Sequence, residues 1–268
     1  MTVWTTGPAP DRYRFTAIEG VRGRSRGVDM TWDEVAEWVR EREGHDVVAK
    51  SKRRGANANT TTSDWAILAG GPGREYEEMD YRSLAFLDVD GTDVVIDDQW
   101  HQDFQAKYDG SYIFQARVPK VTAPEGDSAP KGPEHYHFIF PLTAPLSVEP
   151  TARSDQWKYH ARLMAVWHGL VDVDLKVGTD HSMRRVSQPF FFYTRTKGGQ
   201  PNVDPARTVV VSNGKALDLT AALANLPVRV RRGRTVVRTT RQVDRTGPGA
   251  GPGDPISASS TAEPCGPS

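Results

Sequence analysis

The stretch Leu84-Ala85-Phe86-Leu87-Asp88-Val89-Asp90-Gly91-Thr92 is an apolar run that ends in two acids. Side chains on a β-strand alternate between its two faces, so Asp88 and Asp90 project together while Leu87 and Val89 pack on the other side. Two adjacent carboxylates repel each other unless a cation, a proton or strong hydrogen bonds hold them. A turn capped by an aspartate, with Gly91 supplying a positive φ, needs only one acid. The pattern therefore predicts a buried strand whose acidic end is a functional site.

The net charge of the 268-residue chain is zero, but the charges are unevenly placed. Residues 75–109 hold eleven acids against Arg82 and Lys107, whereas residues 229–245 hold seven arginines against Asp244 alone. A neutral total is therefore compatible with a polyanionic partner. The arginine-rich segment is either a solvated extension or a sequence-independent, salt-sensitive contact to nucleic acid.

Composition also excludes several classes of protein. Cys265 is the only cysteine, so a disulfide framework or a cysteine metal site within the chain is excluded. The sequence has no apolar run of about 20 residues and no signal-peptide core, which favours a soluble cytoplasmic protein that does not enter a membrane. Hydrophobic residues make up 37% of the chain, which indicates that part of its length does not join a core.

Periodicity and capping patterns predict strands and helices that alternate without a regular βα repeat. Thr31-Trp32-Asp33-Glu34 is a capping box that starts a helix ending near Gly44, and Asp97 caps a helix that ends at Gly110. A further helix is predicted over residues 150–167 and a short one over 217–226. Strands are predicted over residues 84–90, 111–117, 135–142, 171–175, 187–194 and 209–211. This order favours an α+β domain with a mainly antiparallel sheet.

The chain is expected to divide into four parts. Residues 1–46 form an N-terminal segment that is helical or irregular, and residues 47–226 form the core. Residues 227–245 are an arginine-rich extension, and residues 246–268 are rich in Gly, Pro and Ser, which predicts a disordered tail.

Three predicted strands present polar pairs on one face each: first Asp88 and Asp90, then His135 and His137, then Asp172 and Asp174. Carboxylate oxygens suit Mg²⁺ or Mn²⁺, which leave coordination positions free for phosphate oxygens. A histidine beside them is suited to hold the phosphates of a nucleotide. Two such metals clamp the attacking and leaving oxygens in nucleotidyl transfer.

In this order of motifs, residues 50–197 resemble the archaeo-eukaryotic primase superfamily, in particular the primase-polymerases of plasmids, phages and mobile elements. The first motif of that family, a strand ending in Asp-x-Asp, matches Leu87-Asp88-Val89-Asp90-Gly91, and the second, a histidine in a strand hairpin, matches residues 135–142. The third motif is an acid after the next helix, here Asp172 or Asp174. The chain departs from the Ser-x-His form of the second motif, because Pro133 stands two residues before His135.

The resemblance implies an RRM-like catalytic core with flanking helices and a two-metal site for Mg²⁺ or Mn²⁺. It implies a DNA primase or DNA polymerase that uses nucleoside triphosphates and a single-stranded DNA template. A separate replicative helicase is an expected partner, because the chain has no Walker-type phosphate loop. The implied metal ligands are Asp88, Asp90, Asp172 and Asp174, with His137 at the triphosphate. The implied nucleotide or nucleic-acid contacts are His135, Arg184, Arg185, Lys197, Lys52, Arg53 and Arg54.

Other functions remain open at this point. Asp88-Val89-Asp90-Gly91-Thr92 also matches the first motif of haloacid-dehalogenase-type phosphatases, but those enzymes need a repeated βα pattern. His135-Tyr136-His137 fits the metal strand of replication-initiator nicking endonucleases, with Tyr159 on the next helix as the nucleophile. A non-catalytic replication or nucleic-acid-binding module is the third alternative.

Overall fold

The computed structural model describes residues 3–19, 25–44, 46–47, 65–71, 81–118, 133–147, 156–194, 196–197, 200–224, 230–231 and 234–235. The helices are α1 (Trp32–Glu43), α2 (Asp98–Tyr108), α3 (Gln156–Leu175) and α4 (Leu219–Ala224), with the 3₁₀ turns η2 (His181–Arg184) and η3 (Pro205–Arg207). The strands are β1 (Thr6–Pro8), β2 (Tyr13–Glu19), β3 (Ser25–Met30), β4 (Asp46–Val47), β5 (Trp65–Leu68), β6 (Tyr81–Thr92), β7 (Tyr112–Ala116), β8 (Glu134–Ser147), β9 (Phe190–Phe191), β10 (Thr196–Lys197), β11 (Gln200–Pro201), β12 (Val209–Val211), β13 (Lys215–Leu217), β14 (Val230–Arg231) and β15 (Arg234–Thr235).

The chain divides into two compact units, Met1–Leu226 and Pro227–Ser268. The first unit ends where the predicted core ends, but it continues through the boundary expected after residue 46. In the second unit β14 and β15 pair as an antiparallel ladder. The predicted tail, 246–268, and most of the arginine-rich extension lie outside the described residues.

The main sheet of the first unit has the order β1-β13-β8-β7-β12, with β6 pairing to β8. Its ladders are antiparallel except for the single parallel pairing between β13 and β8. The strands predicted over residues 84–90, 111–117, 135–142 and 209–211 correspond to β6, β7, β8 and β12. The expected α+β class with a mainly antiparallel sheet is thus confirmed, and the described ladders lack the βα repeat of a phosphatase of the haloacid-dehalogenase type.

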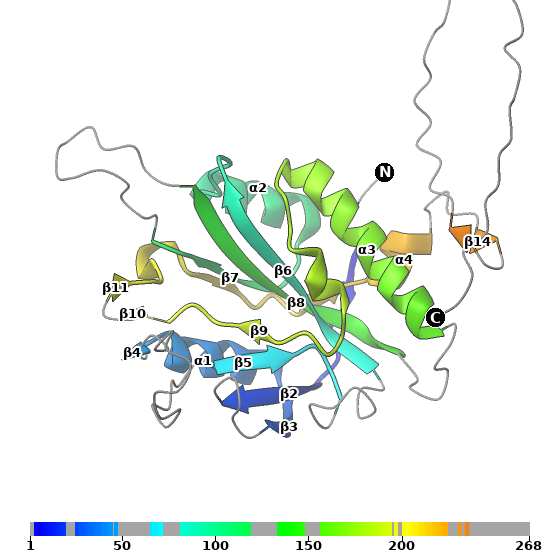
Figure 1. Cartoon of the computed structure of the whole chain (residues 1–268), viewed down its shortest axis with the longest axis horizontal. Coiled ribbons are helices and arrows are strands. Elements are labelled where there is room, and N and C mark those ends of the chain that lie inside the picture. Colours follow the sequence, from blue (N-terminus) through cyan, green and yellow to red (C-terminus); the bar gives the residue numbers. More distant parts are fainter. Residues whose placement is uncertain are drawn as a thin grey trace, which may run out of the picture. The chain divides into compact units, whose positions relative to one another are not determined.

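The main sheet lies between α2 and α3 on one side and α1 with a second sheet on the other (Figure 1). A hydrophobic core fills each side. On one face, Leu87 and Val89 of β6 and Phe138 of β8 pack with residues of α2 and α3; we call this the packed face. On the opposite face, Leu84 and Phe86 pack with α1 and with a second sheet, of order β3-β2-β5-β9. The alternation expected for β6 therefore holds, and both sides of this strand are covered.

The core that contains Leu84 and Phe86 includes many residues from the first 46 of the chain. Phe15 and Thr16 on β2 and Val35 on α1 are fully buried, and Ile18 on β2 is nearly so. The sequence pattern gave no strand assignment before residue 31, because both faces of β2 are buried and period-two alternation is therefore absent. The N-terminal segment is part of the fold that supports the site.

Strand β5 reaches β6 through a close backbone contact. The amides of Ser83 and Leu84 donate to the carbonyl of Ala69, at 2.8 and 3.1 Å. A Cβ atom at Gly70 would lie 2.0 Å from the carbonyl oxygen of Tyr81, so only glycine fits at this position. The two sheets are thereby joined near the start of β6.

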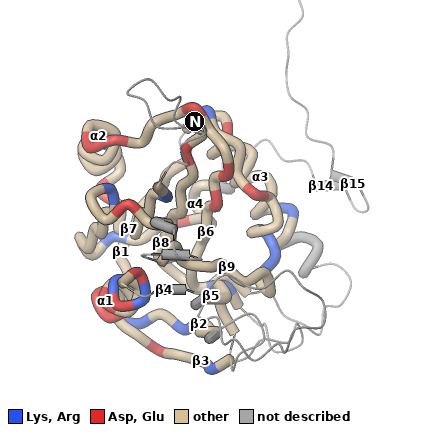
Figure 2. Tube along the Cα trace, turned by 60° about the vertical axis from the view of Figure 1, so that its left-hand side comes forward, with Lys and Arg blue, Asp and Glu red and all other residues tan. Residues whose placement is uncertain are grey.

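The caps predicted for the first two helices are present. Thr31 and Glu34 form the capping box of α1, a helix with acids in its first turn and arginines in its last (Figure 2). The Asp97 side chain accepts a hydrogen bond from the Trp100 amide at the start of α2. The C-cap of α2 is Asp109, with φ 50°, rather than Gly110.

The strand predicted over residues 171–175 is wrong, because this segment is the last turn of α3. Val-Asp-Val-Asp-Leu alternates like a strand, but buried Met164, Trp167, Val171 and Leu175 continue a helical spacing. Residues two apart lie on opposite sides of a helix. Accordingly Asp172 and Asp174, expected on one face, make contacts on different sides.

The predicted strand over residues 187–194 is also shorter than expected, since β9 comprises only Phe190–Phe191. Among the described residues, the helices are too short or too polar to cross a membrane.

Candidate active site

The acidic end of β6 faces a pair of histidines on β8. The antiparallel register places Asp88 opposite His137 and Asp90 opposite His135. Partners in such a register lie on the same face of the sheet, so all four side chains belong to one surface. Gly91, with φ 75°, and a register shift after Asp90 then end the regular pairing. The two polar pairs thus sit where the ladder stops.

The two acid–histidine pairs differ in burial. Oδ1 of Asp88 lies 3.2 Å from Nε2 of His137, and the two side chains are 19% and 7% exposed. Oδ1 of Asp90 lies 2.9 Å from Nδ1 of His135, with exposures of 66% and 24%. The inner pair is not aligned for a hydrogen bond, which leaves buried Oδ1 of Asp88 without a hydrogen-bond partner among the described residues. The other ring nitrogen of His137, Nδ1, is buried and also has none there. The exposed part of the inner carboxylate is therefore not Oδ1, which lies buried beside His137.

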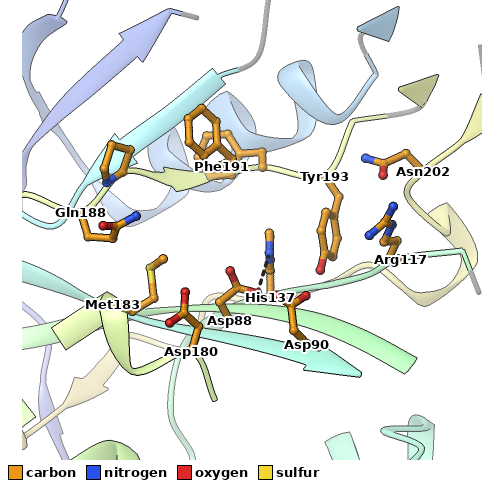
Figure 3. A pocket seen from close by; sticks show the side chains of 12 residues that line it. Asp88, Asp90, Arg117, His137, Asp180, Met183, Gln188, Phe191, Tyr193 and Asn202 are labelled. Atoms are coloured by element: carbon orange, nitrogen blue, oxygen red, sulfur yellow. Dashed lines mark ion pairs between the residues drawn. The ribbon is translucent and has the colours of Figure 1, made fainter. Parts of the chain in front are cut away.

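These groups open into a pocket of about 300 Å³ (Figure 3). Its wall is lined by Asp88, Asp90, Arg117, His137, Asp180, Met183, Gln188, Pro189, Phe191, Phe192, Tyr193 and Asn202. Figure 3 shows the three carboxylates gathered at the β6 side, with Phe191 and Gln188 across from them. The pocket thus combines an acidic wall, formed by Asp88, Asp90 and Asp180, with an aromatic wall, formed by Phe191, Phe192 and Tyr193.

Asp180 is the acid in this pocket that sequence reasoning missed. Its amide donates to the carbonyl of Asp88 at 2.7 Å, and Thr179 bridges to Val89, so the segment lies along the free edge of β6. Asp180 also caps η2 by accepting a hydrogen bond from the Ser182 amide. The helical spacing of buried apolar residues continues through Leu175, so Asp172 and Asp174 belong to the helix. That spacing could have indicated that the acid following the helix is Asp180.

The pocket also holds a cation and an aromatic stack that the sequence patterns did not single out. Arg117 follows β7 and is the arginine among the lining residues. The ring of Tyr193 stacks on His137 with centroids 3.7 Å apart and an angle of 18°. Burial, reinforced by the charges of Asp88 and Asp90, raises the pKa of Tyr193, so its hydroxyl keeps its proton at neutral pH.

Gln115 fixes the position of Tyr193. Its amide group donates to the Tyr193 carbonyl and accepts from the Tyr193 amide, both at 3.2 Å. The same Gln115 nitrogen donates to Glu43 of α1 at 3.1 Å. The aromatic wall is therefore tied to both β7 and the N-terminal helix.

The structure brings some predicted site residues together and leaves others apart. Asp88, Asp90 and His137 line the pocket, and His135 contacts Asp90 beside it. The described residues Asp172, Asp174, Arg184 and Arg185 do not line it. Lys52, Arg53 and Arg54 lie outside the described residues, as does the side chain of Lys197.

The two acids of α3 have other partners. The carboxylate of Asp172 accepts a hydrogen bond from the Thr179 amide at 2.8 Å and lies 2.9 Å from Nε2 of His181. Asp174 accepts a hydrogen bond from the Trp4 indole at 2.7 Å. Asp172 thus supports the segment that leads to Asp180, and Asp174 ties the N-terminus to α3.

The helix that carries Tyr159 lies on the packed face. Met164 and Trp167 of α3 belong to the core with Phe138, whereas His137 is on the other side of β8. The Tyr159 side chain itself lies outside the described residues. This arrangement does not favour a nicking endonuclease with Tyr159 opposite the two histidines.

The donor set fits a divalent cation held partly by substrate. Within the part of the chain that the structure describes, no group of three or more His, Cys, Asp or Glu side chains is arranged to hold a metal ion. Mg²⁺ and Mn²⁺, however, often bind through one or two carboxylates and complete their shells with water and substrate phosphates. The partly exposed carboxylate of Asp88 and the exposed carboxylate of Asp90 suit that kind of open site.

No protein-family model and no curated protein matches the chain. Among solved structures, it is similar to the AEP domain of the primase-polymerase of cyanophage S-2L. The match covers 84% of this chain and 91% of that chain, with 16% sequence identity and a TM-score of 0.34. A similarity of this size carries no argument about function, which must therefore be argued from the pocket and the sequence motifs.

Proposed function

We propose that the protein is a metal-dependent nucleotidyltransferase, a DNA primase or DNA polymerase with an RRM-like catalytic core. It acts in the replication of a plasmid, phage or mobile element. The observation that carries the proposal is the meeting of Asp88, Asp90, Asp180 and His137 in one open pocket that also contains Arg117. Grouped carboxylates need a cation, and the nearby basic groups suit the phosphates of a nucleoside triphosphate.

In this proposal Asp88 and Asp90 hold Mg²⁺ or Mn²⁺, and Asp180 takes the place of the third acid expected at Asp172 or Asp174. When bound, the metals neutralise charge on the transferring phosphoryl group and on the attacking and leaving oxygens. His137 and Arg117 donate hydrogen bonds to triphosphate oxygens. Gln115 and Tyr193 keep the His137 ring in place, because Gln115 binds the Tyr193 backbone and Tyr193 stacks on the ring. The aromatic wall excludes water from the reacting groups.

The test is incubation with a single-stranded DNA template, Mn²⁺ and either dNTPs or NTPs, followed by sizing of the products. New strands made without a primer establish priming, and extension of a primer alone establishes a polymerase. A nicked product covalently attached to the protein would overturn the proposal in favour of the endonuclease.

Matched variants connect the activity to the pocket. We expect Asp88→Asn with Asp90→Asn to lower incorporation by at least about 100-fold, because metal stabilisation of the transferring group is worth several kcal/mol. Asp180→Asn should also lower it, whereas Asp174→Asn, whose amide oxygen can still accept from Trp4, should leave it near the parent rate. If the double variant extends primers as well as the parent, the assignment is wrong.

A further inference from the structure

Arg82 on β6 is a buried cation that the proposed chemistry does not use. Its side chain is 0% exposed, and Nε and Nη1 have no hydrogen-bond partner among the described residues. Burial lowers its pKa to about 9, so the guanidinium stays charged at neutral pH. Burying a charge without an opposite charge is strongly unfavourable. A gain in folding stability therefore does not explain why an arginine is buried at this position.

The hydrogen bonds that Arg82 makes lead to the 3₁₀ turn η2. Its Nη2 donates to the carbonyl of Met183 at 3.3 Å and to the carbonyl of Arg184 at 3.0 Å. These carbonyls are at the C-terminal end of the turn, where backbone oxygens lack partners within the turn and carry partial negative charge. A guanidinium is well suited to bind both.

The other end of η2 is attached to the same strand. Asp180, its N-cap, donates through its amide to the carbonyl of Asp88, and the preceding Thr179 bridges to Val89. Strand β6 therefore holds η2 at both ends, by backbone at the start and by the Arg82 side chain at the finish. Asp180 and Met183 of this segment both line the pocket (Figure 3).

We infer that Arg82 is a positioning residue, which holds η2 so that the carboxylate of Asp180 faces Asp88 and Asp90. The consequence for metal binding rests on the proposed function, whereas the consequence for the backbone of η2 does not. An apolar side chain cannot donate to the two carbonyls, and a short polar one does not reach them. Lysine can donate to them, but as a point charge without the planar fork of arginine.

The first test is hydrogen–deuterium exchange of the metal-free protein. We expect Arg82→Met to speed exchange of the amides in residues 179–185 about tenfold, because η2 loses the two hydrogen bonds that hold its C-terminal end. Arg82→Lys should restore part of the protection. The control is Arg42→Met, which removes a guanidinium bound to the Trp38 carbonyl within α1 and should not change exchange at 179–185.

Unchanged protection in Arg82→Met would overturn the inference. If Arg82→Met does not fold, Arg82→Gln decides by the same measurement, because glutamine is polar but too short to reach both carbonyls. Exchange at 179–185 equal to that of the parent in Arg82→Gln would equally overturn it.

The second test is a double-mutant cycle on Mn²⁺ binding, measured by calorimetry. Arg82→Met should weaken binding about tenfold in the parent but less than about twofold in Asp180→Asn, because a residue that acts through Asp180 has no effect once that carboxylate is gone. Additive effects would show that Arg82 does not act through Asp180. If the parent binds no Mn²⁺ alone, the cycle is measured with Mn²⁺ and a nucleoside triphosphate together. If it does not bind these either, the proposed function fails, while the exchange measurement still decides the role of Arg82.

Discussion

The two faces of the β6–β8 ladder are built from alternate residues of the same strands, yet the exposure of their side chains differs. On the packed face, Leu87, Val89, Phe138 and Phe140 are all at most 2% exposed. On the other face, burial fades along β6 from Leu84 through Asp88 to Asp90, whose side chain is 66% exposed. The packed face holds the strands together along their length. On the opposite face of β6, the exposed side chain, that of Asp90, lies at the end that opens to solvent.

The largest expected difference between the faces is in stability. Phe138→Ala should lower the free energy of unfolding by about 3–5 kcal/mol, because it removes a buried ring from a close-packed core. Phe138 lies 4.8 Å from Phe114 and 5.7 Å from Phe140, measured between ring centroids. Urea unfolding measures the change. The control is Asp90→Ala on the opposite face, for which we expect a change within about 0.5 kcal/mol; equal losses would contradict the contrast between the faces.

A smaller effect should separate the two histidines of the polar face. His137→Ala should cost about 2–3 kcal/mol of unfolding free energy, because it empties a buried position and removes the stack on Tyr193. His135→Ala should cost less than about 1 kcal/mol, since its partner Asp90 is 66% exposed and solvent weakens the pair. Thermal or urea unfolding of the two variants side by side measures the difference. A larger loss in His135→Ala would mean that the outer pair, not the inner one, is structural.

The smallest effect is a dependence on pH that arises from helices covering the packed face. Burial lowers the pKa of His168 on α3 to about 3, and that of His101 on α2 to about 4. Each folded-state pKa lies below the unfolded value, so the unfolded chain binds more protons as pH falls. The contribution of these histidines to the free energy of unfolding is therefore fully present above about pH 6.5. Below that pH, the contribution of His168 declines by about 1.4 kcal/mol per pH unit.

Urea unfolding at several pH values between 7 and 4 checks this, with His168→Gln as the control variant. Glutamine does not titrate, so the slope of stability against pH should become shallower in the variant. An identical slope in both proteins would show that His168 is accessible to protons in the folded state.

Much of the fold could be predicted from local patterns. The capping box at Thr31, the cap at Asp97 and the alternation of β6 and β8 depend on residues close together in the chain, and the structure has all of them. The first 30 residues escaped prediction because β2 is covered on both faces. The last turn of α3 has a strand-like sequence, because Asp172 and Asp174 alternate with apolar residues over a stretch too short to distinguish the two periods.

The site could be predicted only in part, for a similar reason. Asp88, Asp90 and His137 lie on two strands whose alternation places them on one face, so their meeting needed only the correct pairing. Asp180 and Arg117 reach the pocket from segments between regular elements. Their positions depend on tertiary hydrogen bonds, such as that from the Asp180 amide to the Asp88 carbonyl, which no local pattern encodes.

The segment that carries Asp180 also has a protective consequence. β6 is a long, apolar strand at the border of the main sheet, and an uncovered strand border can recruit a strand from another molecule. Thr179 and Asp180 occupy that border beside Val89 and Asp88. A movement that carried Asp180 away from the pocket would at the same time expose a surface on which copies of the chain could associate. Keeping the acid in place and keeping this strand edge covered therefore depend on the same few hydrogen bonds.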